Sequence, residues 1–327
     1  MQIIELGAGR GSLIQDILRV CAHFKLSDST SVHLVEMSPF LSKLQSQRLC
    51  HSSNTVDEST NLPYYRVGET LAGVKVFWYQ RIQDIPEEFS IIIANEFFDA
   101  MPIHKLKKDN NVWKEVLVDV DPDDQNKLRY VLSKNETPIS KLYSTLYPDD
   151  TRKDVEVSPE TDIIVNYIAE RLERQGGFGL IIDYGHFGDE SDTFRVNHRN
   201  QQDHPSFLIH FLFQAFKNHK LHDPLVDPGN ADLTADVDFK NIKSICEHND
   251  KLITFGPIDQ GVFLKNMEAE ARLEILLSKS LPEEKENLKS GYDMLVNPEK
   301  MGQRFKFFAM FPSVLRDHLT KYKIEGF

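Results

Sequence analysis

The sequence predicts an α/β fold with a Rossmann-like, doubly wound sheet. Strand patterns alternate with helical patterns over residues 1–102, and this alternation is typical of parallel sheets. The run FSIIIA at 89–94 is almost wholly apolar, as expected for a central strand that helices cover on both faces. A glycine-rich turn, ELGAGRG at 5–11, links the first strand to the first helix, as in nucleotide-binding folds.

The elements of this first part of the core follow from hydrophobic periodicity and from capping residues. Ser38 and Pro39 are expected to cap and start the second helix, which would bury Leu41, Leu44 and Leu49. Residues 50–63 are polar and are expected to form a loop. Strands are predicted at 1–6, 31–36, 74–79 and 89–94, and helices at 13–24 and 39–49.

A β-rich insertion is predicted at 103–157, before the second part of the core at 158–327. Alternating patterns at 112–120 and 128–132 flank an acidic turn at 119–124, which indicates antiparallel strands. The α/β alternation then resumes, with additional helices toward the carboxyl terminus. We expect helices at 160–174, 238–248, 271–279 and 283–295, and strands at 179–183 and 304–311.

The composition excludes several classes of protein. A net charge of −12 argues against a general nucleic-acid binder, which would normally show a basic face. No run of 18 apolar residues is present, so no membrane span is expected. The 3 cysteines and 12 histidines show no disulfide or metal-ligand spacing, and no metal is predicted. An acidic protein can still attract a basic substrate, such as an arginine-bearing protein segment.

The glycine turn is the first segment that carries chemistry. Gly7, Gly9 and Gly11 allow a sharp turn and a close approach of a ligand to the backbone, with Glu5 two residues ahead. Dinucleotide sites prefer a G-x-G-x-x-G spacing, whereas this turn reads E-x-G-x-G-x-G. That spacing favours S-adenosyl-L-methionine, which has no phosphate. A purely structural turn remains the alternative.

Glu36 stands at the carboxyl end of the second strand, where an acidic side chain can accept both hydroxyls of a ribose. It therefore indicates a cofactor that contains ribose, although a helix-capping or solvated glutamate remains possible at this position.

Two further segments follow strands at the edge where open α/β sheets bind ligands. After the fourth strand, Glu96 is our candidate for the main ligand of a guanidinium, with Asn95 and Asp99 supporting it. After the fifth strand, Asp183, Tyr184 and His186 are candidates for the substrate side. Either segment could instead be a structural turn.

Several longer segments together resemble the MidA family of mitochondrial complex I assembly factors, and the resemblance covers nearly the whole chain. They are VHLVEMSPFLSKLQ (32–45), IIANEFFDAMPIHK (92–105), LIIDYGH (180–186), ADLTADVDF (231–239), GPIDQGVFLKNM (256–267) and GYDMLVNPEKMGQRFKFFA (291–309).

This resemblance implies a class I methyltransferase fold in the mitochondrial matrix. It implies symmetric dimethylation of an arginine on a core matrix-arm subunit of respiratory complex I, with that subunit as partner. It also implies that Glu5, Gly7, Gly9, Gly11 and Glu36 bind S-adenosyl-L-methionine, and that Asn95, Glu96 and Asp99 face the substrate.

The sequence departs from the family pattern in two places. Family members carry a region ahead of the glycine motif, including an import presequence and a segment expected to cover the cofactor. The sequence printed here starts at Met1, just before that motif, without this region. The residues VNHRNQQDHPSFLIHFLFQ at 196–214 form an insertion, which we interpret as an intron read through in frame or as a lineage-specific loop.

Three functions therefore compete at this point. A protein arginine methyltransferase is favoured by the combination of motifs. A non-catalytic assembly chaperone with an incomplete methyltransferase fold would keep the fold without the reaction. A dinucleotide-dependent oxidoreductase fits the strand–turn–helix and Glu36, but not the glycine spacing.

Overall fold

The computed structural model describes residues 1–188, 214–217, 220–222, 225 and 232–327. Residues 196–213 of the expected insertion lie outside these. The chain divides into two compact units. The core unit comprises 1–98, 163–185 and 239–327, and the second unit comprises 99–162 and 186–238.

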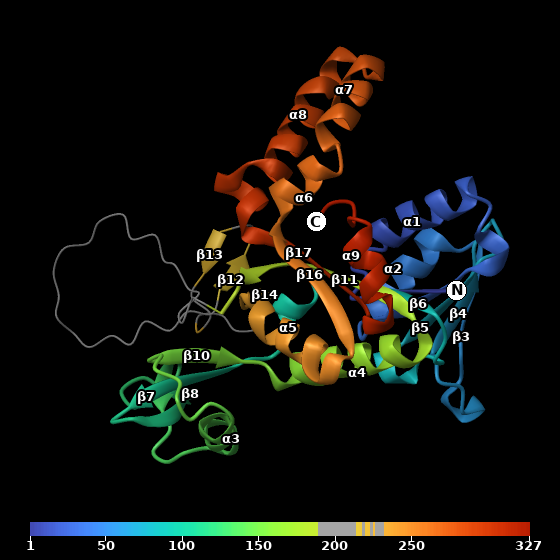
Figure 1. Ribbon diagram of the computed structural model, residues 1–327. Helices are drawn as coiled ribbons and strands as arrows, with labels where there is room; N and C mark the ends of the chain where they lie inside the picture. Colours follow the sequence, from blue (N-terminus) through green and yellow to red (C-terminus); the bar gives the residue numbers. More distant parts are fainter. Residues whose placement is uncertain (189–213, 218–219, 223–224, 226–231) are drawn as a thin grey trace. The chain divides into compact units, whose positions relative to one another are not determined.

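The core unit is built on one sheet with the strand order β16-β17-β11-β6-β1-β2-β5-β4-β3 (Figure 1). Its strands are β1 (Gln2–Leu6), β2 (Ser31–Val35), β3 (Ser52–Thr55), β4 (Arg66–Glu69), β5 (Lys75–Tyr79), β6 (Ser90–Asn95), β11 (Gly177–His186), β16 (Leu252–Asp259) and β17 (Phe305–Pro312).

The central strands of this sheet are parallel, as the sequence predicts. β1 pairs in parallel with β2 on one side and with β6 on the other, so the direction of winding reverses between β1 and β6. Every residue of β1 is buried, as expected for a central strand covered on both faces, and this includes the polar residues Gln2 and Glu5. β17 runs antiparallel to both β11 and β16 and extends the sheet at that end.

The helices α1 and α2 lie on one face of the sheet and α4 lies on the other (Figure 1). The core cluster under α1 and α2 includes Ile14, Val32, Leu34 and Trp78. The helices of this unit are α1 (Ser12–His23), α2 (Pro39–Leu49), most of α4 (Pro159–Gln175), α5 (Phe239–Glu247), α6 (Gln260–Asn266), α7 (Ala269–Lys279), α8 (Pro282–Val296) and α9 (Arg316–Lys321).

The structure corrects two predictions in this unit. The segment 50–63 is not wholly a loop, because it contains β3, which pairs antiparallel with β4 at the sheet edge. Most side chains of β3 are exposed, so this strand needs no apolar alternation and gives no strand pattern. The buried face of α2 is also largely polar: Ser42, Gln45 and Ser46 are buried with Leu49, whereas Leu41 and Leu44 are only half-buried.

The second unit contains the expected antiparallel strands. Its four-stranded sheet has the order β10-β7-β8-β9, and a small core forms around Leu106, Trp113 and Tyr143. The elements are β7 (His104–Asp109), β8 (Val112–Val120), β9 (Leu128–Leu132), α3 (Pro138–Leu146), β10 (Asp154–Val157), β12 (Gln214–Lys217), β13 (Lys220–His222), β14 (Asp232–Thr234) and β15 (Val237–Asp238). We did not predict α3, which Thr137 caps.

A buried arginine joins α4 to the first residues of the two central strands. Arg171 is fully buried, and its guanidinium donates hydrogen bonds to Gln2 Oε1 at 2.6 Å, Ser90 Oγ at 3.2 Å and the Ile85 carbonyl at 3.0 Å. Gln2 begins β1 and Ser90 begins β6. The arginine therefore fixes the amino ends of the strands between which the winding reverses.

Replacing Arg171 with alanine should destabilise the protein strongly, because it opens a cavity and leaves several buried acceptors without a donor. We expect a loss of about 3–5 kcal/mol in the free energy of unfolding, measured by urea denaturation. Arg174→Ala is the matched control, since Arg174 lies on the same helix in an exposed ion pair with Glu87. Equal small effects of the two substitutions would contradict the anchoring role of Arg171.

Candidate functional site

The carboxyl ends of the central strands align three sequence-predicted positions at one edge of the sheet. Beyond each strand, one more backbone hydrogen bond continues the pairing. Gly7 N–H donates to the Val35 carbonyl at 3.0 Å, and Glu36 N–H donates to the Tyr79 carbonyl at 3.0 Å. Glu96 N–H donates in the same way to the Ile182 carbonyl, at 2.9 Å. In open α/β sheets this edge is where ligands bind.

The glycine turn has a backbone that side-chain-bearing residues rarely adopt. Gly7, Gly9 and Gly11 have φ values of 64°, 51° and 75°, all in the left-handed region that favours glycine. A Cβ at Gly7 would lie 2.9 Å from Phe97 Cδ2, so this glycine also permits a close contact. A Cβ at Gly9 would meet nothing within 4 Å, which leaves open space beside the backbone at the middle of the turn.

Glu5 brings a buried carboxylate to the start of this turn. Its side chain is 3% exposed, and its Oε2 atom has no hydrogen-bond partner among the described residues. Burial raises the pKa of Glu5 to about 7, and a hydrogen bond from the Ile14 backbone opposes part of that shift. A buried carboxylate oxygen without a partner fits a ligand that supplies an N–H or O–H donor.

Glu36 belongs to a buried hydrogen-bond network centred on Gln45. Glu36 Oε1 accepts from Ser38 N–H at 2.8 Å, and Oε2 accepts from Gln45 Nε2 at 3.0 Å. The same Gln45 nitrogen donates to the Gly9 carbonyl at 2.8 Å, and Gln45 Oε1 accepts from Trp78 Nε1 at 2.8 Å. One amide thus ties the glycine turn to the acidic residue, while each carboxylate oxygen of Glu36 retains accepting capacity.

The loop after β6 presents one exposed carboxylate from a well-held backbone. Glu96 is exposed and has a φ of 49°, in the left-handed region. Asn95, the last residue of β6, is half-buried. The next two backbone N–H groups, of Phe97 and Phe98, donate to Asp183 Oδ2 at 3.2 and 2.9 Å. Asp183 is therefore fully buried beneath the loop.

The remaining candidates are divided between the two units. Tyr184 is half-buried in the core unit, and its ring centroid lies 5.6 Å from that of Phe305. Asp99 and His186 belong to the second unit. There, Asp99 is buried and its carbonyl accepts from Ala235 N–H at 2.9 Å, while His186 Nδ1 accepts from Gly188 N–H at 3.0 Å.

The core unit brings together most of the predicted site residues and adds others that we did not predict. The predicted ones are Glu5, Gly7, Gly9, Gly11, Glu36, Asn95, Glu96, Asp183 and Tyr184. Gln45, Trp78 and Phe97 are the additions. A signal for Gln45 was present, because Ser38, Ser42, Gln45 and Leu49 lie at helical spacing and could share one inward face.

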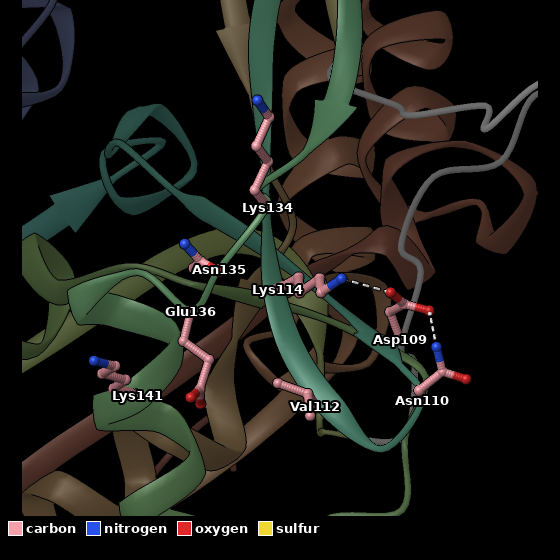
Figure 2. A pocket seen from close by; sticks show the side chains of 8 residues that line it. All are labelled: Asp109, Asn110, Val112, Lys114, Lys134, Asn135, Glu136 and Lys141. Atoms are coloured by element: carbon pink, nitrogen blue, oxygen red, sulfur yellow. Dashed lines mark hydrogen bonds and ion pairs between the residues drawn. The ribbon is translucent and has the colours of Figure 1, made fainter.

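A hollow of about 350 Å³ lies in the second unit around Lys114, Lys134 and Lys141 (Figure 2). Lys114 is already paired with Asp109 at 2.7 Å, and no lining side chain is fully buried. The lining side chains are mostly exposed and of mixed charge, so they do not form a preorganised site. This hollow is therefore a surface depression rather than a cofactor pocket.

Among the residues that the structure describes, no cluster of three or more metal-binding side chains occurs. Within the same residues, no helix is long and apolar enough to cross a membrane. The three cysteines are free thiols, and burial raises the pKa of Cys50 to about 11.

Comparison with known proteins gives concordant results. A family model described as "Putative S-adenosyl-L-methionine-dependent methyltransferase" matches residues 1–258. The Drosophila melanogaster protein named Protein arginine methyltransferase NDUFAF7 homolog, mitochondrial, is 50% identical over 329 residues, or 100% of this chain and 71% of the fly protein. The human protein named Protein arginine methyltransferase NDUFAF7, mitochondrial, is 42% identical over 316 residues, or 95% of this chain and 66% of the human protein.

The fold has a counterpart among crystal structures. A Burkholderia thailandensis protein bound to S-adenosyl-homocysteine superposes with a TM-score of 0.69 at 20% identity. The superposition covers 96% of this chain and 72% of that chain. The predicted fold is therefore confirmed, and the family match favours methyl transfer over the dinucleotide-dependent oxidoreductase.

Glu5 should make the stability of the ligand-free protein depend on pH. Folding raises the pKa of Glu5 from 4.5 to about 7, so the folded state keeps a proton that the unfolded state releases between these values. The free energy of unfolding should therefore fall as the pH rises through this window. Relative to Glu5→Gln, which is always neutral, the wild type should lose roughly 3 kcal/mol, measured by urea denaturation at each pH.

A difference between wild type and Glu5→Gln that stays constant from pH 4.5 to pH 7 would contradict this assignment, since the amide cannot titrate. Asp16→Asn, a change at an exposed carboxylate on α1, controls for the general effect of removing a negative charge.

Proposed function

The chain belongs to this family of S-adenosyl-L-methionine-dependent methyltransferases, and we propose that it methylates the guanidinium of an arginine on a protein. The observation that carries the proposal is the exposed carboxylate of Glu96, held at the carboxyl end of β6 on the loop whose Phe97 contacts the glycine turn. The names of the fly and human relatives, both protein arginine methyltransferases, support the same substrate class.

The residues at the sheet edge fit the cofactor. We propose that Glu36 accepts the ribose hydroxyls and that Gly7, Gly9 and Gly11 let the cofactor approach the backbone closely. The unpartnered oxygen of Glu5 would accept a hydrogen bond from the ammonium of the methionine moiety. The cofactor supplies a methyl group on a positively charged sulfur, which makes that carbon open to attack by a nitrogen lone pair.

The protein's own contribution is positioning. Glu96 would bind the guanidinium through charge-assisted hydrogen bonds and so orient one nitrogen for in-line attack. The same contact places the Glu96 carboxylate, which can accept a proton, beside the attacking nitrogen. The proton on that nitrogen becomes acidic only as the new bond forms. Asn95, the last residue of β6, is proposed to support this recognition, and a supporting role for Asp99 stays a prediction from the sequence.

The biological setting is proposed from the resemblance to complex I assembly factors. We infer that the substrate is a core matrix-arm subunit of respiratory complex I, that the product is symmetric dimethylarginine, and that the reaction takes place in the mitochondrial matrix. The fly and human relatives are named mitochondrial, which supports the organelle.

Gln45→Leu should weaken cofactor binding, because Glu36 and the Gly9 carbonyl lose their shared donor and can shift apart. We expect the Kd for S-adenosyl-L-methionine to rise on the order of tenfold to a hundredfold in calorimetric titration, as for other residues that orient a ligand group. Gln47→Leu is the matched control, because Gln47 is exposed on the same helix. Comparable affinities of the two variants would argue against the network.

Glu96→Gln should abolish most methyl transfer while leaving cofactor binding intact. Losing the negative charge weakens the hold on the guanidinium, so turnover should fall on the order of a hundredfold, with the Kd for S-adenosyl-L-methionine within a factor of about two. The assay follows transfer of a labelled methyl group to a purified complex I matrix-arm subunit, with symmetric dimethylarginine identified by mass spectrometry.

Glu88→Gln, a change at an exposed glutamate before β6, is the control for this assay and should retain full turnover. Wild-type transfer to a residue other than arginine would overturn the proposed substrate. Full activity of Glu96→Gln would instead overturn the role of Glu96.

A further inference from the structure

Asp183 is a fully buried carboxylate that accepts hydrogen bonds from three backbone N–H groups. Its Oδ2 accepts from the N–H groups of Phe97 and Phe98, and its Oδ1 accepts from the Tyr184 N–H at 3.0 Å. Carboxylate hydrogen bonds of this kind are stronger than those between neutral groups. These hydrogen bonds connect the end of β11 to the loop that follows β6.

Glu96, the residue just before Phe97 and Phe98, has an unfavourable backbone conformation. Glu96 has a φ of 49°, a conformation that a glutamate rarely adopts. Two other residues with long side chains have a left-handed backbone, Lys25 with a φ of 58° and Glu268 with a φ of 57°. Both directly follow the last turn of a helix, where this conformation is common. Glu96 instead follows a central strand, so surrounding contacts must hold it there.

Contacts on both sides of Glu96 meet this requirement. Its own N–H donates to Ile182, immediately before Asp183, while Asp183 receives the two following N–H groups. The Phe97 ring lies against Gly7, where a Cβ would be only 2.9 Å from Phe97 Cδ2. The loop therefore contacts β11 through its backbone and the glycine turn through a ring.

We propose that Asp183 is a positioning residue, which fixes the left-handed backbone of Glu96 by holding the next two N–H groups and so presents the Glu96 carboxylate beside the cofactor turn. The consequence for catalysis rests on the proposed role of Glu96 as the guanidinium ligand. The coupling between Asp183 and the Glu96 backbone does not depend on that role.

A melting-temperature cycle on the ligand-free protein tests this coupling. Asparagine tolerates the left-handed region better than glutamate does, so Glu96→Asn should raise the Tm of wild type by roughly 1–3 °C. In Asp183→Asn, an NH2 group, which cannot accept a hydrogen bond, replaces one of the two accepting oxygens. The loop is then free to relax. The gain from Glu96→Asn should then vanish.

Glu268→Asn is the matched control, because it makes the same chemical change at another left-handed glutamate. Its effect on Tm should be equal in the wild-type and Asp183→Asn backgrounds. An equal gain from Glu96→Asn in both backgrounds would overturn the proposal, whatever the substrate of the enzyme.

Hydrogen exchange in the wild type provides a test that needs no stable variant. The amides of Phe97 and Phe98 should exchange slowly, as expected for donors to a buried carboxylate. Exchange at the rate of an exposed loop would overturn the proposal even if Asp183→Asn failed to fold.

Activity then separates positioning from general stability. Asp183→Asn should lower turnover on the order of tenfold to a hundredfold while the Kd for S-adenosyl-L-methionine stays within a factor of about two. A loss of turnover that only matches the loss of folded protein would refute positioning. Absence of arginine methylation by the wild type would instead refute the proposed function and leave the Tm cycle valid.

Discussion

The candidate site depends on one constraint of the parallel sheet: neighbouring strands that run the same way end at the same edge. Gly7, Glu36 and Glu96 each extend this pairing with a backbone hydrogen bond just beyond a strand. Their positions are therefore set by the ladder itself, and loop flexibility has little influence. The buried guanidinium of Arg171 fixes the opposite ends of β1 and β6, so the register on which the site depends is held at both ends.

Buried polar groups do most of the positioning at this edge. Gln45 joins Glu36 to the Gly9 carbonyl, and Asp183 joins β11 to the loop after β6. Such groups are costly to bury unless their hydrogen bonds are made, and the cost favours the one arrangement in which they are made. Glu5 is the exception, since one of its oxygens has no described partner. The same burial that raises its pKa makes it receptive to a ligand donor.

Much of the fold follows from local patterns. The apolar run at 89–94 and the alternation at 112–120 each predict a strand close to its observed bounds. β6 is buried along most of its length, and burial alternates over the first half of β8. The β3 strand was missed, since an exposed edge strand carries no such pattern. The inward face of α2 was misjudged because that helix packs against the glycine turn. Contact with backbone there favours small side chains and hydrogen-bonding amides over leucine.

The sequence by itself determined the parallel core, the glycine turn, the acidic residues after the strands and the family. These depend on residue type and spacing, which the chain displays directly. Only the tertiary structure showed that Gln45 bridges the turn to Glu36, that Glu96 has a left-handed backbone, and that Asp183 lies beneath the loop. The physical reason is that these features join segments far apart in the chain: Gln45 and Gly9 are 36 residues apart, and Asp183 and Phe98 are 85. Local spacing carries no information about which of many polar residues will meet across such distances.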